Sequence, residues 1–523
     1  MIIQMKSFRF ALLALIGLLT VVSCEPKPEE PESKETKANI DVASCSIKEG
    51  AYIDPLRTTS VTITFGNGIM LRLSQTPNVT LNGAVVTPVM NGALTGFEIA
   101  LALEAEKDYE LVVPQGAIQS YRDASRVNPE FKLHFNTKQG EKPKDPVISA
   151  DNLVAAMGFG WNLGNHFDSG DLQHDHQGYP WGWWDKTEPT EALYDSLVSY
   201  GIKTLRMPVT WGNEQGYGPT YTINADYMAD VKKNVDWALS KGMYVLVNTH
   251  HDEYWQDAVK AVGDAALCDS IEDRIVATWQ QIANIFKDYD DEHLIYETFN
   301  EIHDEGWGWG SAPYASICTL VEKWNQIAVD VIRKSGGNNA TRWIGVPGFC
   351  ASPWYTDGRK HLLKLPNDPA NKIMVAVHSY DPFEFCTEGT RQQWGHTYQG
   401  NDNDENSIKT MFDNLKTQFI DKGIPCYVGE FGAVTRKSAA DEPYRSYFLE
   451  YFCRTAYFAG IPVMLWDNNN NTGTGGGGEC FWYINHANGV AFQPELVKLM
   501  QNAATSTSEG YTIQNVYNRA PKL

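Results

Sequence analysis

From Asp151 onward the chain repeats one pattern, in which an amphipathic helix ends at a glycine and an apolar strand follows. In residues 191–200, Leu193 and Leu197 fall on one helical face, and Gly201 leads into the next apolar run. Glycine suits the left-handed residue that ends a helix. The pattern gives five strand candidates, at 202–208, 243–249, 342–346, 424–430 and 461–466, and three further apolar runs, at 158–163, 294–299 and 373–379, bring the number to eight. This alternation predicts a (β/α)8 TIM barrel rather than an open sheet.

Residues 40–138 have a different pattern of short alternating runs, such as 61–65 and 109–114, separated by Gly, Asn and Pro. Short strands with frequent turn signals predict a small all-β sandwich. The runs 109–118 and 131–137 resemble bacterial Ig-like domains found ahead of surface enzymes. Residues 139–150 are rich in Pro and charge, which indicates a linker, and the barrel is expected over 151–516.

The N-terminus has the pattern of an export signal. Lys6 and Arg9 precede an apolar run that is too short to span a bilayer, and residues 1–23 are therefore predicted to be a signal peptide. Ser23-Cys24 resembles the lipobox of bacterial lipoproteins, which implies acylation of Cys24 and an acidic flexible leader over 24–39. We expect an exported lipoprotein of the outer membrane or cell surface. The alternative is a chance cysteine and a secreted protein.

Composition limits the partners. The chain has 523 residues and a formal charge of −21 without a Lys/Arg cluster, which argues against nucleic acid. Sixteen Trp and 25 Tyr supply flat faces on which sugar rings stack, although most aromatic side chains belong to the core. The nine cysteines form no CxxC pair, so there is no zinc signature, and the sequence does not pair them as disulfides. We expect a monomer.

Polar side chains gather at the ends of the predicted strands. In a (β/α)8 barrel the carboxyl ends of the strands meet at one face, where active sites lie. The run 294–301 closes with Asn300 and Glu301, and the run 424–430 closes with Glu430. The other strand-end residues are Asn162, Asn165, Arg206, His250, His251, His378, Tyr380, Trp466, Asp467 and Asn468. The pattern predicts a cleft with two carboxylates on well-separated strands.

The phrases around these residues resemble glycoside hydrolase family 5, most closely its subfamily 4 of endo-β-glucanases and xyloglucanases. The phrases are residues 158–165, 248–251, 299–301, 378–380 and 429–432, and the resemblance covers about 151–516. One departure is the asparagine run 468–471, where the subfamily usually has a glycine after Asp-Asn. The resemblance implies that Glu301 is the acid/base and Glu430 the nucleophile, without metal or cofactor.

Retaining cleavage of a glycosidic bond needs such a pair, about 5–5.5 Å apart. We expect Arg206 to keep the pKa of Glu430 low while that of Glu301 stays higher. Asn300 is expected to bind the sugar 2-hydroxyl. Further substrate contacts are assigned to Asn165, Arg206, His250, His251, His378, Tyr380 and Trp466, with Trp466 as the platform under the reacting sugar.

Several nearby residues have other interpretations. Glu297 is expected to be a satisfied polar residue of the barrel core. His250 and His251 are not expected to share an ion, because neighbouring strand residues point to opposite faces. His174, Asp175 and His176 are interpreted as a cleft-wall loop rather than a metal site, and residues 473–478 as a mobile rim loop. Trp181, Trp183, Trp184, Trp211, Trp255, Trp307 and Trp309 are candidates for stacking on sugars.

Two hypotheses follow from the sequence. The first is a retaining endo-β-1,4-glucanase that acts on cellulose-like, mixed-linkage or xyloglucan chains. The second is a non-catalytic surface glycan-binding lipoprotein built on an enzyme-derived barrel. A non-catalytic protein derived from such an enzyme usually lacks one of the two catalytic carboxylates. Both glutamates are present here, so the sequence favours the enzyme.

Overall fold

The computed structural model describes residues 40–53, 60–66, 70–104, 107–137, 150–169, 184–252, 258–310, 312–471 and 480–522. The chain divides into two compact units, Met1–Asp145 and Pro146–Leu523. No helix within these ranges combines the length and apolar character that a membrane crossing requires. The predictions for the signal peptide, Cys24 and the linker lie outside the described residues, except for Ala150, which begins the first helix.

The larger unit is a closed barrel of parallel strands, each paired with the next along the chain, and the last pairs with the first. The strands are β12 (Phe159–Asn162), β13 (Thr204–Met207), β14 (Tyr244–Asn248), β15 (Leu294–Glu297), β16 (Ile344–Pro347), β17 (Ile373–Ser379), β18 (Cys426–Phe431) and β19 (Val463–Leu465). Each lies at a predicted strand position. The predicted (β/α)8 fold is therefore confirmed, because both faces of each strand are buried as a helix-covered barrel requires.

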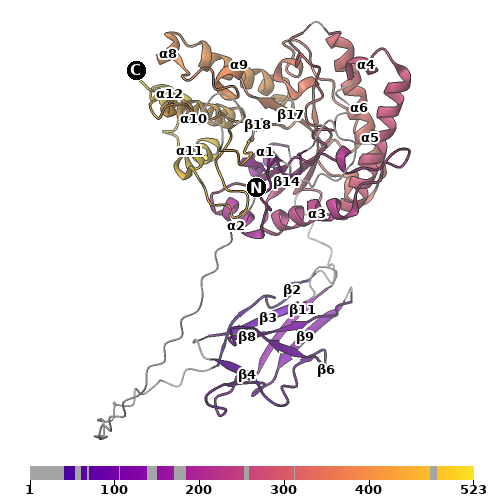
Figure 1. The fold of residues 1–523 in the computed structure, drawn as a ribbon, viewed down its shortest axis with the longest axis vertical. Coiled ribbons are helices and arrows are strands. Elements are labelled where there is room, and N and C mark those ends of the chain that lie inside the picture. The colour runs from indigo at the N-terminus through magenta and orange to yellow at the C-terminus, as the bar shows by residue number, and fades with distance from the viewer. Residues whose placement is uncertain are drawn as a thin grey trace, which may run out of the picture. The chain divides into compact units, whose positions relative to one another are not determined.

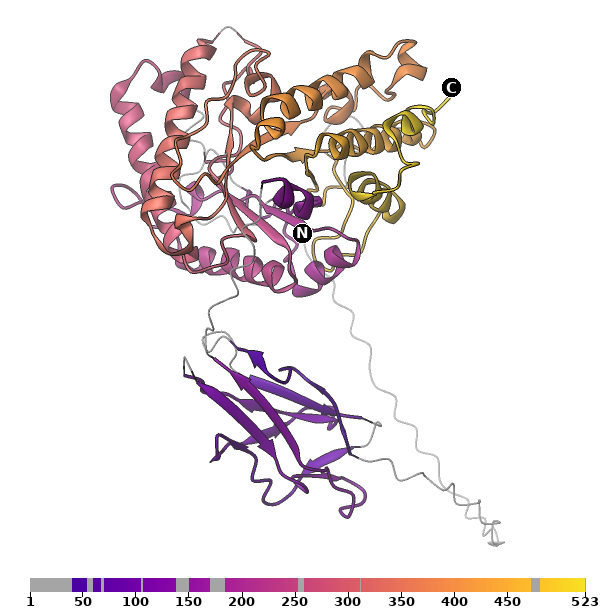
Figure 2. The same ribbon diagram turned by 180° about the vertical axis from the view of Figure 1, so that it is seen from behind.

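Helices surround the strands (Figures 1 and 2). They are α1 (Ala150–Met157), α2 (Glu191–Ser199), α3 (Ala225–Ser240), α4 (Ala258–Ala261), α5 (Ala265–Phe286), α6 (Tyr314–Lys334), α7 (Phe383–Cys386), α8 (His396–Gln399), α9 (Asn403–Gln418), α10 (Glu442–Ala459), α11 (Pro494–Thr505) and α12 (Ile513–Tyr517). In α2, Leu193 and Leu197 are buried as predicted. Gly201, which follows that helix, has a φ of 79°, the conformation expected of a helix-ending glycine.

The barrel interior has an apolar layer on the side that α1 closes and a polar layer at the carboxyl ends of the strands. Leu153 and Met157 of α1 pack in one buried cluster with inward residues of the strands, including Leu246, Ile295 and Met464. Polar residues follow at the carboxyl ends of several strands. Because the apolar layer fills the space below, these polar groups face the end of the barrel at which active sites are found.

The smaller unit consists of short antiparallel pairs, together with one parallel pair between β2 and β11. Its strands are β1 (Val42–Cys45), β2 (Ala51–Tyr52), β3 (Ser60–Phe65), β4 (Leu71–Leu73), β5 (Thr80–Leu81), β6 (Ala84–Val85), β7 (Pro88–Met90), β8 (Gly96–Ala100), β9 (Asp108–Val113), β10 (Ile118–Ser120) and β11 (Phe131–Asn136). Val61, Ile63 and Phe65 of β3 point into its core, which is the alternation expected of a half-buried strand. The predicted small β unit is present, and its Ig-like character stays a prediction.

Candidate active site

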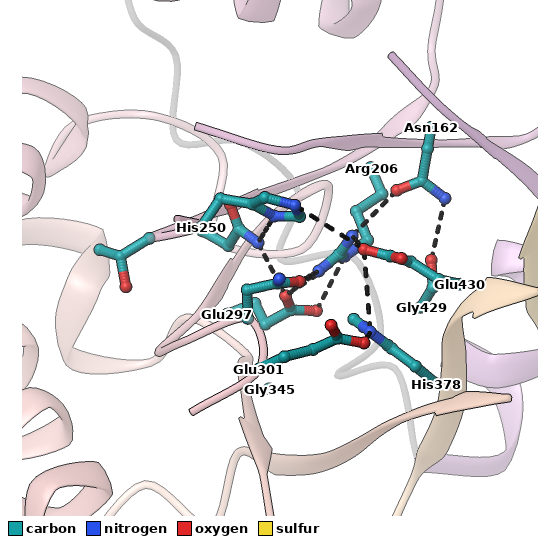
Figure 3. Close-up of polar contacts among 12 residues, drawn as sticks. Asn162, Arg206, His250, Glu297, Glu301, Gly345, His378, Gly429 and Glu430 are labelled. Carbon is teal, nitrogen blue, oxygen red and sulfur yellow. Dashed lines mark hydrogen bonds and ion pairs between the residues drawn. The ribbon is translucent and has the colours of Figure 1, made fainter. Parts of the chain in front are cut away.

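Arg206 is the centre of the polar layer. This fully buried side chain rises from β13, and all five of its N–H groups have acceptors (Figure 3). Nη1 donates to Glu430 Oε1 at 2.6 Å and to Asn162 Oδ1 at 3.0 Å, and Nη2 donates to Glu297 Oε1 at 2.6 Å and to Asn300 Oδ1 at 2.7 Å. Its Nε also faces Glu297, at 3.2 Å. One guanidinium therefore fixes four side chains from three parts of the chain.

Glu297 lies on the barrel side of Glu301, and both of its carboxylate oxygens accept hydrogen bonds. Its Oε2 accepts from the Tyr427 hydroxyl at 2.6 Å, and its Oε1 accepts from Asn248 Nδ2 at 3.0 Å in addition to the Arg206 contact. Burial would raise the pKa of Glu297, but Arg206 and the Tyr427 hydroxyl lower it below its ordinary value. The carboxylate is thus the permanent counter-ion of Arg206, in agreement with its interpretation as a polar residue of the core.

A bulge in β18 aims Glu430 at Arg206. Val377 pairs with Val428, but the next residue of β17, His378, pairs with Glu430, so Gly429 is an extra residue in β18. Because side chains alternate along a strand, the extra residue turns Glu430 to the face that Tyr427 occupies. Glu430 Oε2 also accepts from the Tyr380 hydroxyl at 3.0 Å. Both carboxylate oxygens therefore have donors.

Glu301 lies beyond its strand rather than at its end. The sequence predicts a strand over 294–299 with Glu301 at its end, but β15 stops at Glu297, and Glu301 follows on a loop. His378 Nδ1 lies 2.6 Å from Glu301 Oε1 and 3.7 Å from Glu430 Oε1. Carboxylate oxygens of the two glutamates lie within 4.8 Å of each other. The side chain of Glu301 is 16% exposed and that of Glu430 is 6% exposed, so solvent reaches both carboxyl groups.

Burial raises the pKa of Glu301 to about 7, and Arg206 and His303 only partly oppose this. Burial also lowers the pKa of His378, its hydrogen-bond partner, to about 4, so a neutral imidazole faces Glu301. The expectation of a low pKa for Glu430 is wrong. Burial raises that pKa above its ordinary value, although His378 and Arg206 act to lower it. Desolvation by the barrel walls outweighs the guanidinium.

The argument that His250 and His251 point to opposite faces is also wrong. The strand β14 ends at Asn248, so both lie in the loop beyond it, and their ring centroids are 4.3 Å apart. Together with Asp168 they offer possible ligand atoms within 4.8 Å of one another. Such a group is a candidate metal site. Whether it can bind a metal depends on which ring nitrogen of His250 carries the hydrogen.

The hydrogen bonds of Asn248 set the tautomer of His250. Asn248 Oδ1 accepts from the Val209 backbone at 2.9 Å, so its Nδ2 must be the atom that lies 3.0 Å from His250 Nδ1. His250 Nδ1 is therefore an acceptor, and Nε2 carries the hydrogen. Nε2 lies 3.9 Å from both Asp168 Oδ2 and Glu430 Oε1. A protonated nitrogen has no lone pair for a metal, so His250 is built as a donor toward carboxylates or a sugar.

The other predicted contact residues occupy different places around the cluster. Arg206 engages the amide oxygen of Asn300, which leaves its amide nitrogen to donate to a ligand. Asn165 has a φ of 63°, and its carbonyl accepts from the backbone of Asp185, so its backbone shapes the first loop. The Trp466 ring is parallel to that of His250, with centroids 6.0 Å apart. A Cβ on Gly164 would lie 2.9 Å from this ring, so Gly164 leaves room for it.

The tryptophans of the loops differ in burial. Trp211 is fully buried and donates to the Asn248 carbonyl at 2.8 Å, so its assignment as a stacking residue is wrong. Trp184, Trp307 and Trp309 are exposed and keep that candidacy. The predictions for Trp181, Trp183, Trp255, residues 174–176 and residues 473–478 lie outside the described residues.

Three polar residues of the site region were not predicted from the sequence. Tyr427 supports Glu297, and inward alternation along β18 could have revealed it. Asp168 is fully buried near His250, and burial raises its pKa to about 7. Neither of its carboxylate oxygens has a donor at hydrogen-bonding geometry, although nearby backbone amides act to lower the pKa. His486 bridges two aspartates from distant segments, and no local pattern marks it.

Comparison with known proteins identifies the family of the barrel unit. Residues 164–472 match the cellulase family, glycosyl hydrolase family 5. Endoglucanase B of Neocallimastix patriciarum is 33% identical over 374 residues, which cover 70% of this chain and 74% of that protein. A native Bacteroidetes-affiliated GH5 cellulase linked with a polysaccharide utilization locus shares 33% identity at a TM-score of 0.66, over 73% of this chain and 99% of that one.

A second solved structure is the GH5-4 broad specificity endoglucanase from Bacteroides salanitronis, with 35% identity and a TM-score of 0.62 over 69% of this chain and 96% of that one. The family match covers more than half of this chain. The chain belongs to glycosyl hydrolase family 5 and is a glycoside hydrolase of the cellulase type.

Proposed function

We propose that the protein is a retaining endo-β-1,4-glucanase that hydrolyses β-glucan chains by double displacement. The observation that carries this proposal is the short separation of the Glu301 and Glu430 carboxylates, which is within 4.8 Å between nearest oxygens. Retaining enzymes hold the pair about 5–5.5 Å apart, whereas inverting enzymes leave roughly 6.5–9.5 Å for a water molecule. The separation supports direct attack by one carboxylate.

Glu430 is the nucleophile in this mechanism. Arg206 Nη1 and the Tyr380 hydroxyl donate to its two oxygens, so its ionised form is oriented and stabilised. It attacks the anomeric carbon and forms a glycosyl-enzyme ester, while the bond to the leaving oxygen breaks. The amide nitrogen of Asn300 donates to the 2-hydroxyl of the reacting sugar, and Trp466 packs against the sugar ring.

Glu301 is the acid/base. Its raised pKa keeps it protonated below about pH 7, so it delivers a proton to the leaving oxygen. The resulting carboxylate then takes a proton from water, which attacks the anomeric carbon and restores Glu430. His378 Nδ1 orients Glu301 throughout. No cofactor takes part in these steps.

The broad specificity in the name of the Bacteroides salanitronis relative supports a substrate range of cellulose-like, mixed-linkage and xyloglucan chains. The rival hypothesis of a non-catalytic glycan-binding protein lacks support, because both carboxylates are present and correctly spaced. We further propose attachment to the cell surface through an acylated Cys24, on the sequence pattern alone.

Product analysis on purified β-glucans tests the activity and its stereochemistry. The purified chain should release oligosaccharides from carboxymethyl cellulose, mixed-linkage glucan or xyloglucan, and proton NMR at early times should show the β-anomer. An initial α-anomer would contradict the retaining mechanism. Binding without any product from all three polymers would favour the non-catalytic alternative.

A further inference from the structure

A buried histidine joins two aspartates beside the cleft. His486 is fully buried, its Nδ1 lies 2.7 Å from Asp185 Oδ2, and its Nε2 lies 3.5 Å from Asp467 Oδ1. Asp467 is also fully buried, and Asp185 is 7% exposed. None of the three takes part in the mechanism proposed above, so this arrangement needs another explanation.

The three residues come from segments far apart in the sequence. Asp185 precedes α2, Asp467 follows β19, and His486 lies before α11. Other contacts tighten the junction: the Trp161 indole donates to Asp467 Oδ2 at 3.0 Å, and the Ile484 backbone donates to the same oxygen at 2.8 Å. The segment that carries Trp466 is therefore tied to two other segments through Asp467.

Two buried carboxylates this close together are unfavourable unless a cation lies between them. Burial alone would lower the pKa of His486, but the hydrogen bond to Asp185 and the attraction to both aspartates outweigh it and raise the pKa to about 9. His166 is the other titratable group of the described residues that interacts with this ring, and burial lowers its pKa to about 4, so it is neutral. His486 is therefore charged at neutral pH.

Asp467 adjoins the sugar platform in sequence and in space. Its carbonyl accepts from the Gly164 backbone at 3.0 Å, and the same Gly164 leaves room for the Trp466 ring. A shift of Asp467 would therefore move Trp466 relative to the reacting sugar. We propose that His486 is a positioning residue, a charged link between Asp185 and Asp467 that holds Trp466 in its sugar-binding place. This inference rests on the proposed glucanase function.

Sugar binding without turnover gives the sharpest test. In a Glu301→Gln background, the dissociation constant for cellotetraose would be measured from pH 6 to 10 by calorimetry, for the parent, His486→Gln and His486→Arg. Loss of the charge should weaken cellotetraose binding on the order of tenfold at pH 6. A shift of the Trp466 ring by about 1 Å relative to the sugar would be enough for a loss of this size. The parent should weaken similarly as the pH rises through about 9, where His486 loses its proton.

The arginine variant separates charge from packing. His486→Arg keeps a positive charge at all these pH values, so its binding should stay within about threefold of the parent at pH 6 and should not weaken toward pH 10. His293→Gln is the matched control, since His293 pairs with Asp290 just before β15, at the opposite end of the barrel. It should leave both affinity and pH dependence unchanged.

Kinetics on the active enzyme add a second measurement. At pH 6, His486→Gln should raise KM for cellotetraose on the order of tenfold with a smaller change in kcat, because the platform binds the sugar in both ground and transition states. Unchanged affinity in His486→Gln, or alkaline weakening that persists in His486→Arg, would overturn the inference alone. Failure of the Glu301→Gln parent to bind cellotetraose, together with failure of the active enzyme to hydrolyse any β-glucan, would overturn the proposed function as well.

Discussion

Arg206 separates the roles of two glutamates. It forms ion pairs of equal length, 2.6 Å, with Glu297 and Glu430, yet only Glu297 is enclosed on every side. Glu297 has the Tyr427 hydroxyl and Asn248 as further donors, whereas Glu430 borders the cleft and has Tyr380. Glu297 is therefore a fixed counter-ion of Arg206, and Glu430 is the one of the two that the proposed mechanism uses as the nucleophile.

Replacement of either cleft glutamate by glutamine should abolish turnover and leave the fold intact. Both groups act on charge that develops during bond cleavage, and the amide is nearly isosteric with the carboxyl. Rates of hydrolysis and thermal unfolding of Glu301→Gln and Glu430→Gln would be measured side by side. General acid–base catalysis contributes 10²–10⁴-fold, so a loss of less than roughly 10²-fold would remove that residue from its role.

The pH dependence of kcat/KM should follow the two raised pKa values. Glu301 must be protonated to donate, so kcat/KM should fall about tenfold per unit as the pH rises beyond about 7. Glu430 must be ionised, and its raised pKa should move the acid limb above the ordinary range of a carboxylate. A profile that stays flat up to pH 9 would show that the titration of Glu301 does not control the rate.

Among the elements, β16 shows how closely the barrel interior is packed. A Cβ on Gly345 would approach the Tyr427 hydroxyl to 2.1 Å, and that hydroxyl is the donor to Glu297 Oε2. A side chain at position 345 would thus displace the tyrosine from the counter-ion of Arg206. The glycine is required by this close approach rather than by its backbone conformation.

Gly345→Ala should lower both stability and activity. The free energy of unfolding should fall by about 1–3 kcal/mol, the usual cost of overpacking, and kcat/KM should fall because the Arg206 network loses a donor. Chemical denaturation and initial rates would measure the two effects. Gly510→Ala is the control, because no atom lies near a Cβ at that position, and it should change neither quantity.

The positions of the eight strands could be predicted from the sequence because an apolar run is a local signal, which a helix-ending glycine strengthens ahead of five of them. The bulge in β18 could not, since it appears only when the register with β17 is known. The error about His250 and His251 has a similar cause: the sequence does not show that β14 ends two residues earlier. The raised pKa of Glu430 could not be predicted either, because it results from burial by the whole barrel.

At the scale of the molecule, the proposed catalytic residues all belong to the unit Pro146–Leu523. The link between His486 and Asp185 spans 301 residues of that same unit, so the barrel is completed by its own C-terminal segment. Such long-range pairs leave no mark in the sequence, which explains why this junction was missed. We therefore expect the proposed chemistry to need nothing from the smaller β unit.

A chain that starts near Asp145 should therefore fold and cleave cellotetraose at the parent rate. The division between the units falls at this residue, and few contacts are expected across a Pro-rich linker. Circular dichroism and oligosaccharide kinetics would compare the shortened chain with the parent, and any loss should be confined to insoluble polymer or cell attachment. An unstable or inactive barrel would show that the β unit packs against it.

The placement of His378 between the two cleft glutamates has a consequence for the reaction cycle. In the resting state of the proposed mechanism Glu430 carries a negative charge and Glu301 a proton; in the proposed glycosyl-enzyme Glu430 is a neutral ester and Glu301 is ionised. The cleft thus holds one mobile charge, which crosses from one carboxyl to the other and back. The Nδ1 of His378 lies 2.6 Å from Glu301 Oε1 and 3.7 Å from Glu430 Oε1, so one ring nitrogen stands beside both ends of that transfer.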